Sequence, residues 1–424
     1  MPARVPSGRD PRRAFLLDLL EAALAAVNGR ARMNLALRDR PRRDTWVLAA
    51  GKAAGAMTLG AIDALGPYVT RALVVTRADC VAPELTGMPG LRCHVAAHPV
   101  PDERSLAAGE AALSMARAAP PGQRVLLLVS GGASSLLEAP ARGVSLEQLR
   151  RVNEWALASG VDIGRINAIR GALSRVKAGG LVRAFAHCDV EAFFISDVPG
   201  DDPAVVGSGL LASRGRPLPP AGDLPAWLGG LLERASRTEG QPLQVPILCV
   251  GRLGEALEAA RRRAEAGGIR AVLHERRLDG EAGAAARMAC AHLAADGPAL
   301  HLFGGETTVV LPPEPGRGGR NQHLALAAAM EIDGCDDRLL LACGTDGSDG
   351  NTEDAGAFAD GCTLDRGRDA GLDAPACLAR ADSGRFLEAT GDLVHTGATG
   401  TNVGDLLFAL RREPGHSQVG GLSM

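Results

Sequence analysis

A lysine stands where an apolar run ends in glycine and small residues, in the segment WVLAAGKAAGAM, residues 46–57. Of the 46 basic residues only two are lysines, Lys52 and Lys177. The glycine before Lys52 lets the backbone turn, and a helix starting there would offer free N–H groups with a partial positive charge. An ammonium adds a compact cation suited to a phosphoryl oxygen. The segment is a candidate phosphate-binding turn without the Walker A spacing, and the alternative is a solvated lysine at a helix start.

A second candidate is the segment LLLVSGGASSLLEAP, where another apolar run ends in two glycines and small hydroxyl residues. Such a segment can form a nest of N–H donors for an anion, although serine also caps helices for purely structural reasons. The chain has no G-x-S-x-G elbow, which argues against an α/β-hydrolase. The residues we expect to bind the cofactor phosphates here are Ser130, Gly131, Gly132, Ala133, Ser134 and Ser135.

Carboxylates follow a third apolar run, in the segment FFISDVPGDDPAVVGSG. Asp197, Asp201 and Asp202 lie around a proline and a glycine, and oxygen ligands at the end of a buried strand suit Mg²⁺. The alternative is a turn stabilised by its own aspartates. We take Asp197 as the first candidate for a catalytic carboxylate or metal ligand.

Two more glycine-rich segments, HLFGGETTV and LACGTDGSDGNTEDAGA, carry acids after apolar runs. Between them, the glycine-flanked loop GRGGRNQ places Arg320 at the start of a helical pattern, where its guanidinium could clamp a phosphate or carboxylate. A merely exposed surface loop is the alternative for Arg320. The candidates for cofactor or metal binding in these two acidic segments are Gly304, Gly305, Glu306, Thr307 and Asp346.

The candidate loops follow short apolar runs that alternate with Ala- and Leu-rich helical patterns. This alternation is typical of an α/β fold with parallel strands covered on both faces. A Pro- and Gly-rich break near residues 214–246 divides the chain, so we expect one domain over 10–240 and a second over 241–424. The expected strands are WVLAAG, RALVVT, RVLLLVSGG, EAFFISD, PILCVG, AVLHER, ALHLFGG and LLLACGTDG.

Composition narrows the classes of function. A formal net charge of −3 gives no sign of binding to nucleic acid or to an anionic membrane. The nine cysteines form no C-x-x-C pair and the nine histidines show no H-E-x-x-H spacing, so scattered reduced thiols fit better than a disulfide framework or a zinc site.

The N-terminal segment RRAFLLDLLEAALAAV reads as an amphipathic helix, because Asp18 and Glu21 interrupt its apolar run. No apolar run reaches the roughly 18–20 residues that a membrane span needs. We therefore expect a soluble, cytoplasmic protein. The sequence does not determine its oligomeric state, and a homodimer is the working expectation.

Taken together, these loops contain the parts that phosphoryl transfer needs. Gly-rich nests hold phosphates, Mg²⁺ bridges their oxygens, and cations offset the charge at the transferring group. The residues alone predict a nucleotide-dependent phosphotransferase and leave the acceptor open.

Seven segments in one order also resemble a known family, the class II glycerate kinases, or glycerate 2-kinases, whose C-terminal part is called the MOFRL domain. The resemblance runs from about Phe15 to about Leu410. The segments are VSGGASSLL, INAIRGALSRVKAGGL, SDVPGDDPAVVGSG, GGETTV, GRGGRNQHLAL, GTDGSDGNTEDAGA and TGATGTNVGDLL.

The resemblance implies ATP-dependent phosphorylation of D-glycerate to 2-phosphoglycerate with Mg²⁺. It implies a Rossmann-like parallel-sheet N-terminal domain, a second α/β domain, and a site in the cleft between them. The family's proposed catalytic cations fall on Lys52 and Arg320 of this sequence. The chain has Arg170-Gly171-Ala172-Leu173-Ser174 where the family often has Arg-Lys-His-Leu-Ser, so a related hydroxy acid stays open as acceptor.

Two other functions are alternatives to this interpretation. An NAD(P)H-dependent hydroxypyruvate reductase would use the G-x-G-x-x-A segment from Gly207 to Ala212, which lies some ten residues beyond its strand. A regulatory protein that binds sugar acids without turnover would not need so many charged loops.

Overall fold

The computed structural model describes residues 10–159, 161–213, 215, 217–235, 243–294 and 299–412. The chain forms two compact units. The first, here called the N-terminal unit, contains Asn28–Arg252 together with Gly400–Asn402. The second, the C-terminal unit, contains Leu253–Thr399, the residues up to Val27 and those from Val403 onward.

The N-terminal unit is built on a six-stranded parallel sheet with strand order β3-β2-β1-β4-β5-β6. Strands β1 and β4 are buried at every position, which explains why their sequences are apolar throughout. The strand order reverses between β1 and β4, and the carboxyl ends of strands at such a switch point form the ligand crevice of doubly wound sheets. The strands are β1 (Thr45–Ala50), β2 (Val69–Thr76), β3 (Leu91–Val95), β4 (Arg124–Val129), β5 (Asp189–Ile195) and β6 (Ile247–Gly251).

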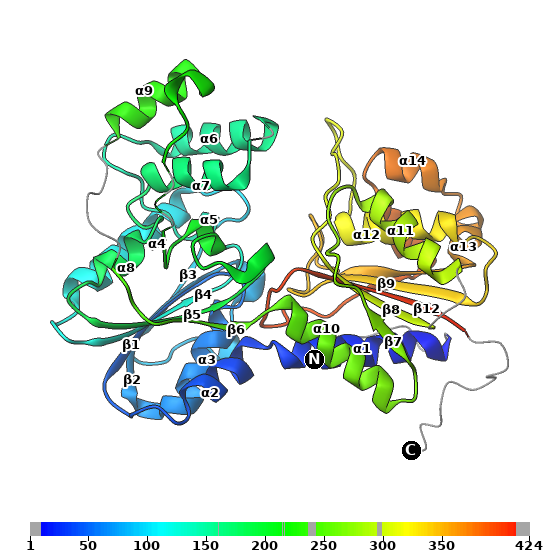
Figure 1. The fold of residues 1–424 in the computed structure, drawn as a ribbon, viewed down its shortest axis with the longest axis horizontal. Helices are drawn as coiled ribbons and strands as arrows, with labels where there is room; N and C mark the ends of the chain where they lie inside the picture. The colour runs from blue at the N-terminus through cyan, green and yellow to red at the C-terminus, as the bar shows by residue number, and fades with distance from the viewer. Residues whose placement is uncertain are drawn as a thin grey trace. The chain divides into compact units, whose positions relative to one another are not determined.

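Helices cover both faces of this sheet. Figure 1 shows α2 and α3 on one face and α4, α5 and α8 on the other. Helices α6, α7 and α9 form a smaller apolar cluster of their own around Leu149, Ile169 and Leu231. The helices are α2 (Gly29–Leu37), α3 (Ala54–Leu65), α4 (Glu103–Ala118), α5 (Ala133–Leu136), α6 (Leu146–Ser159), α7 (Ile163–Ala172), α8 (Gly180–Ala184) and α9 (Ala226–Arg234).

The C-terminal unit contains a mixed six-stranded sheet with strand order β11-β10-β9-β12-β8-β7. Strand β12 runs antiparallel to both of its neighbours, and β7 runs parallel to β8. The expectation of parallel strands therefore holds for the first sheet but is wrong for most of the second, because a strand buried on both faces is apolar whichever way it runs. The strands are β7 (Ala271–Leu273), β8 (Leu300–Gly305), β9 (Arg338–Gly344), β10 (Gly356–Asp360), β11 (Leu393–Val394) and β12 (Asp405–Arg411).

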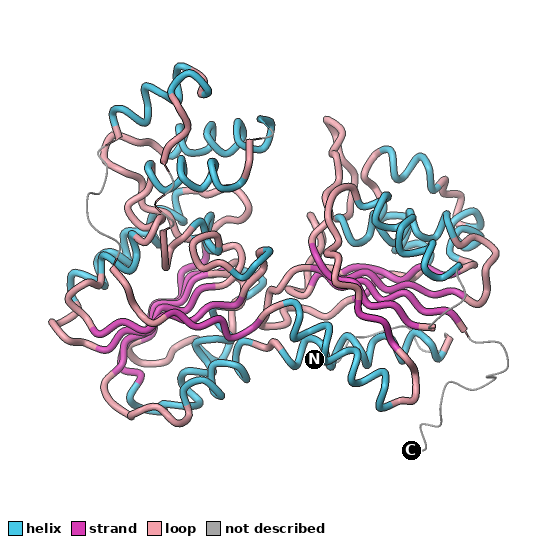
Figure 2. Tube along the Cα trace, in the orientation of Figure 1, coloured by secondary structure: helices cyan, strands magenta, loops and turns pink. Residues whose placement is uncertain are grey.

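This second sheet is also covered on both faces, by α11 and α12 on one side and by α1 and α10 on the other (Figures 1 and 2). All eight expected strands are present, whereas β3, β10, β11 and β12 were not expected. The helices are α1 (Pro11–Ala26), α10 (Leu253–Ala266), α11 (Ala282–Ala294), α12 (Arg320–Glu331), α13 (Thr363–Asp369), α14 (Ala374–Ala379) and α15 (Ser383–Thr390).

The division of the chain differs from the boundary expected at residue 240, which itself lies outside the described residues. Strand β6 completes the first sheet by pairing with β5. Helix α1 is the amphipathic helix expected near the N-terminus, and it packs on α10 of the C-terminal unit. Its buried Arg13 forms ion pairs with Asp360 and Asp392, at 2.5 and 2.6 Å. None of the described helices is long and apolar enough to cross a membrane.

Candidate functional site

The turns after β1 and β4 are bound to each other at the switch point of the first sheet. The backbone N–H of Lys52 donates to the carbonyl of Gly131 at 2.9 Å, and the N–H of Ala53 donates to the hydroxyl of Ser130 at 3.0 Å. Gly51 has φ +123°, and a Cβ on it would lie 2.3 Å from Ser130 Oγ. The fully buried Ser130 hydroxyl is thus a bridge between the two turns, so its role is to position the candidate phosphate loop.

Gly131 brings that loop against a carboxylate. A Cβ on Gly131 would lie 1.9 Å from Asn402 Nδ2 and 2.1 Å from Asp197 Oδ2. Asn402 Nδ2 itself donates to Asp197 Oδ2 at 3.4 Å. The absence of a side chain at Gly131 therefore lets Asp197, just beyond β5, approach the backbone of the loop directly.

The neighbouring Gly132 lies beside the candidate catalytic lysine. Its φ of +83° favours glycine, and a Cβ on it would meet His98 Cδ2 at 3.2 Å and Lys52 Cγ at 3.3 Å. Lys52 and Asp197, which are 145 positions apart, are therefore both next to the same pair of glycines. The structure brings together three elements that the sequence offered separately: a cation, a glycine pair and a carboxylate.

The hydroxyls that follow the glycines have protein partners. Ser134 Oγ lies 2.7 Å from Ser208 Oγ, and Ser135 Oγ donates to the carbonyl of Gly132 at 3.2 Å. Ala133 begins the short helix α5, with Gly132 as its N-terminal cap residue. These contacts hold the loop in shape.

A cavity of about 260 Å³ opens beside this loop. Its wall includes Lys177, whose Nζ lies 2.5 Å from Glu138 Oε2 in a buried ion pair. The polar residues that α6 and α7 contribute to this wall were not expected there, although two of them belong to the segment INAIRGALSRVKAGGL. The polar and charged lining residues are His98, Ser134, Ser135, Asn153, Asn167, Arg170, Lys177, Asp197 and Ser208.

Arg170 is a second cation of this wall, beside Lys177. Its Nε donates to Asn153 Oδ1 at 3.1 Å, and burial lowers the pKa of the guanidinium from its usual value. A larger hollow of about 380 Å³ lies beside β3, lined by residues such as Arg71 and Arg92, but it contains none of the candidate residues. The smaller cavity, by contrast, is lined by four candidate residues, Gly132, Ser134, Ser135 and Asp197.

In the C-terminal unit, Arg320 at the start of α12 contacts two carboxylates. Its Nε and Nη2 donate to Asp405 at 2.5 and 3.0 Å, and its Nη1 lies 2.7 Å from Glu306 Oε1. Asp405 is nearly buried, with 3% of its side chain exposed, whereas Glu306 is 51% exposed. These neighbouring carboxylates outweigh the effect of burial and raise the pKa of Arg320, which is therefore a fixed cation.

Asp349 caps the helix that carries Arg320. Its carboxylate accepts hydrogen bonds from the backbone N–H groups of Asn321 and Gln322, at 3.1 and 2.8 Å. Burial, with the nearby charge of Asp405, raises the pKa of Asp349 to about 7 despite these donors. A Cβ on Gly319 would lie 2.4 Å from Asp349, so this glycine is needed for the cap.

The remaining predicted residues of this unit lie around the end of β8 and after β9. Gly304 and Gly305 end β8, and a Cβ on Gly305 would lie 2.1 Å from the carbonyl oxygen of Leu278, so close chain packing requires this glycine. The hydroxyl of Thr307 is buried and has no hydrogen-bond partner among the described residues. Asp346 accepts from the backbone N–H of Ser348 at 3.0 Å. An unsatisfied hydroxyl beside Glu306 fits a ligand-binding position.

The acids predicted as metal ligands suit an Mg²⁺ ion that is bound mainly by oxygens of the substrate. Asp197 belongs to the N-terminal unit, and Glu306 and Asp346 belong to the C-terminal unit. In the described ranges, these three acids are not among the groups of three or more side chains with donor atoms close enough for one metal ion. Mg²⁺ commonly uses one or two carboxylates, with phosphate oxygens and waters as further ligands, so a single acid beside the glycine loop, such as Asp197, fits it.

The dinucleotide segment from Gly207 to Ala212 does not adopt the geometry its pattern requires. It forms a single 3-10 turn at Val206–Ser208 followed by Gly209 at φ +74°, and no helix starts there among the described residues. The pyrophosphate fingerprint needs a strand, a tight turn and a helix N-terminus. This segment instead contributes Ser208 to the cavity wall.

Comparison with known proteins adds sequence relatives. A domain family of unknown function, DUF4147, matches residues 15–216, and the MOFRL family matches residues 299–405. The D-glycerate 2-kinase of Thermotoga maritima is 34% identical, over 86% of this chain and 90% of its own length. An Agrobacterium vitis protein provisionally named hydroxypyruvate reductase is 36% identical, over 93% of each chain.

A solved structure has a similar fold. The crystal structure of the glycerate kinase of Thermotoga maritima matches with a TM-score of 0.80 and 30% sequence identity. The match covers 95% of this chain and 100% of the Thermotoga maritima chain.

Proposed function

Since this chain belongs to the class II glycerate kinase family, with its C-terminal MOFRL domain, we propose that it transfers the γ-phosphoryl group of ATP to D-glycerate and releases 2-phosphoglycerate and ADP. The chain is a kinase. The identity of the phosphoryl donor, the requirement for Mg²⁺ and the choice of hydroxyl are our proposal.

The observation that carries this proposal is the convergence of Lys52, the Gly131–Gly132 pair and Asp197 at the switch point of the first sheet. The glycine backbone can approach phosphate oxygens closely, and Lys52 supplies a compact positive charge beside it. Phosphoryl transfer depends mainly on positioning and on neutralising charge, which this arrangement offers.

We assign the roles as follows. The backbone of residues 130–135 holds phosphate oxygens, and Lys52 stabilises the charge that spreads over the transferring group. Arg320 acts as the second cation, either on the phosphoryl oxygens or on the carboxylate of glycerate, and its two carboxylate partners keep the guanidinium in one orientation.

Asp197 is our first choice for accepting the proton of the attacking hydroxyl or for holding Mg²⁺. The loose transition state of phosphoryl transfer requires little early proton removal, which favours the metal-holding role. Glu306 and Asp346 are the other candidate ligands. An Mg²⁺ ion held by these residues would reduce the negative charge on the phosphate oxygens.

The reductase alternative has weaker support. Related Agrobacterium vitis proteins bear a hydroxypyruvate reductase name, but the G-x-G-x-x-A segment of this chain lacks the strand–turn–helix geometry of a dinucleotide site. A reductase would oxidise NAD(P)H with hydroxypyruvate in the absence of ATP.

The direct test incubates the purified protein with ATP, Mg²⁺ and D-glycerate and follows the products by phosphorus NMR, which separates 2-phosphoglycerate from 3-phosphoglycerate. We expect 2-phosphoglycerate and an equal amount of ADP, with no product when chelator replaces Mg²⁺. Parallel incubations contain tartronate, or hydroxypyruvate with NAD(P)H. Turnover of either compound without phosphorylation of glycerate would overturn the proposal.

A further inference from the structure

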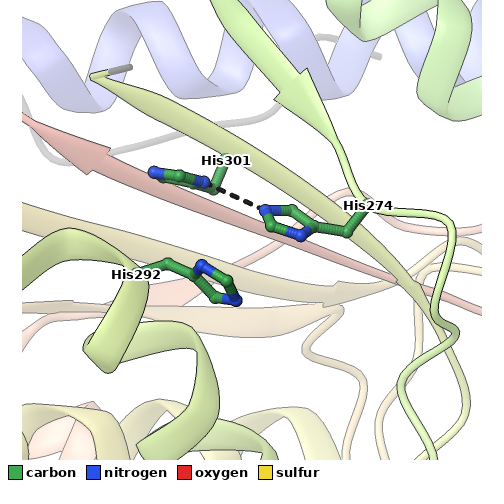
Figure 3. A group of neighbouring side chains, drawn as sticks. All are labelled: His274, His292 and His301. Atoms are coloured by element: carbon green, nitrogen blue, oxygen red, sulfur yellow. Dashed lines mark hydrogen bonds between the residues drawn. The ribbon is translucent and has the colours of Figure 1, made fainter. Parts of the chain in front are cut away.

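Three of the nine histidines gather at the edge of the second sheet. His274 follows the edge strand β7, His292 lies in the last turn of α11, and His301 is in β8 (Figure 3). One ligand nitrogen from each lies within 4.8 Å of the others. His274 Nε2 and His301 Nδ1 are 3.0 Å apart and share a hydrogen bond.

The strand register and the packing of α11 create this group. Val272 of β7 is opposite His301, and the N–H of His274 continues the pairing to the carbonyl of Leu302 at 3.0 Å. Side chains alternate along a strand, so His301 and Phe303 share the face that α11 covers. The ring of His274 stacks on Phe303 at 4.0 Å between centroids.

The surroundings keep the three imidazoles close together and partly dehydrated. His301 is 6% exposed, and the other two are intermediate in exposure.

We propose that His274, His292 and His301 form a binding site for one Zn²⁺-type divalent cation. Ligand nitrogens at about 2.0–2.1 Å from a tetrahedral zinc ion lie roughly 3.3–3.4 Å apart, close to the spacing of the His274 and His301 nitrogens. A modest turn of His292 brings the third nitrogen into range, and water fills the fourth position. Imidazole ligands favour Zn²⁺ or Co²⁺ over the Mg²⁺ of phosphoryl transfer.

The position of the site indicates a structural role. His301 precedes Gly305 by four residues, which corresponds to about 13 Å along the strand, so the site is separate from Glu306 and Arg320. A bound ion would connect the short edge strand β7, the end of α11 and β8. Binding only to the folded state stabilises that state, and the C-terminal unit would gain this stability.

The test uses full-length protein stripped of metal by a chelator and then given Zn²⁺. We expect one equivalent of Zn²⁺ to remain after gel filtration and the thermal unfolding midpoint to rise. Co²⁺ in place of Zn²⁺ should give visible d–d bands without the near-ultraviolet band of thiolate ligands. His292→Ala should weaken Zn²⁺ binding by roughly a hundredfold or more and remove the thermal shift.

Arg287→Ala is the matched control, because Arg287 lies on the same helix and is 60% exposed, and it should bind Zn²⁺ like the parent. His274→Gln is a second ligand variant, so a folding failure of one variant leaves the test standing. Absence of bound Zn²⁺ in the parent, equal binding in both ligand variants, or a thiolate band with Co²⁺ would overturn the proposal.

Discussion

Arg320 donates two hydrogen bonds to the nearly buried carboxylate of Asp405, from Nε at 2.5 Å and from Nη2 at 3.0 Å. The two residues are 85 positions apart, one at the start of α12 and the other at the start of β12. A guanidinium bound at two points cannot rotate freely, so its remaining Nη1 has a fixed direction. A cation oriented in advance stabilises developing charge without reorganising during the reaction.

This pairing predicts that Arg320→Lys lowers kcat by about a hundredfold or more, although the positive charge remains, because an ammonium cannot make the two-point contact. Asp405→Asn should lower kcat less, by about tenfold, because the guanidinium of Arg320 then keeps only one charged carboxylate partner. Steady-state kinetics with ATP and glycerate measure both effects. Arg262→Lys, on an exposed side chain of α10, is the control and should leave kcat unchanged.

Lys52→Arg should keep the fold and lose most of the activity, about a hundredfold in kcat, because a broad planar guanidinium cannot replace a compact ammonium at a phosphoryl oxygen. Lys52→Ala should be at least as impaired. Circular dichroism and the thermal midpoint establish that both variants fold. Full activity of the arginine variant would show that the lysine is not required as a compact cation.

Gly131→Ala should abolish most of the activity through one methyl group. Its Cβ would lie within 1.9 Å of Asn402 Nδ2 and 2.1 Å of Asp197 Oδ2, so both side chains must move away from the loop. Gly229→Ala is the matched control, since Gly229 lies within helix α9 with nothing within 4 Å of the added Cβ. That variant should retain activity and be slightly more stable. Unaltered turnover of Gly131→Ala would contradict the placement of Asp197.

Lys177→Met should destabilise the protein by about 3–5 kcal/mol, because it leaves the carboxylate of Glu138 buried without its partner. Glu138 also accepts from Ser174 Oγ at 2.6 Å, so its charge organises this part of the cavity wall. Lys177→Met combined with Glu138→Gln should recover much of the lost stability. Denaturant unfolding of the single and double variants measures the difference, and equal loss in both would exclude a buried charge as the cause.

Asp360 predicts a pH-dependent contribution to stability. Burial alone would raise its pKa, but hydrogen bonds from Arg366 and Arg13 outweigh burial and lower the pKa to about 2. Because the folded-state pKa lies below the ordinary value of 3.8, the ion pairs contribute their full stabilisation from about pH 5 upward. This stabilisation is lost as the pH falls toward 2.

The comparison of parent and Asp360→Asn by denaturant unfolding tests this prediction. The difference in unfolding free energy should be about 2 kcal/mol from pH 5 upward and should shrink between about pH 4 and pH 2. A difference that stays constant over that range would contradict a lowered pKa.

The sequence by itself determined much of the first sheet. Apolar runs that end in glycine or polar residues located β1, β4 and β5 together with Lys52, the glycine pair and Asp197. These positions could be predicted because a strand buried on both faces is apolar throughout. In such sheets, ligands bind at the turns that follow the carboxyl ends of the strands. The family resemblance rested on the same local segments.

Only the tertiary structure decided which distant residues meet. Asp405 and Asn402 belong to one segment, yet Asp405 binds Arg320 and Asn402 binds Asp197, in different units. No local sequence pattern predicted the direction of β12 or the attachment of α1 to the C-terminal unit. Local sequence patterns show which segments are buried and where the chain turns. Strand order and cross-chain ion pairs depend on how the whole chain packs, and residues far apart in sequence carry no local sign of that contact.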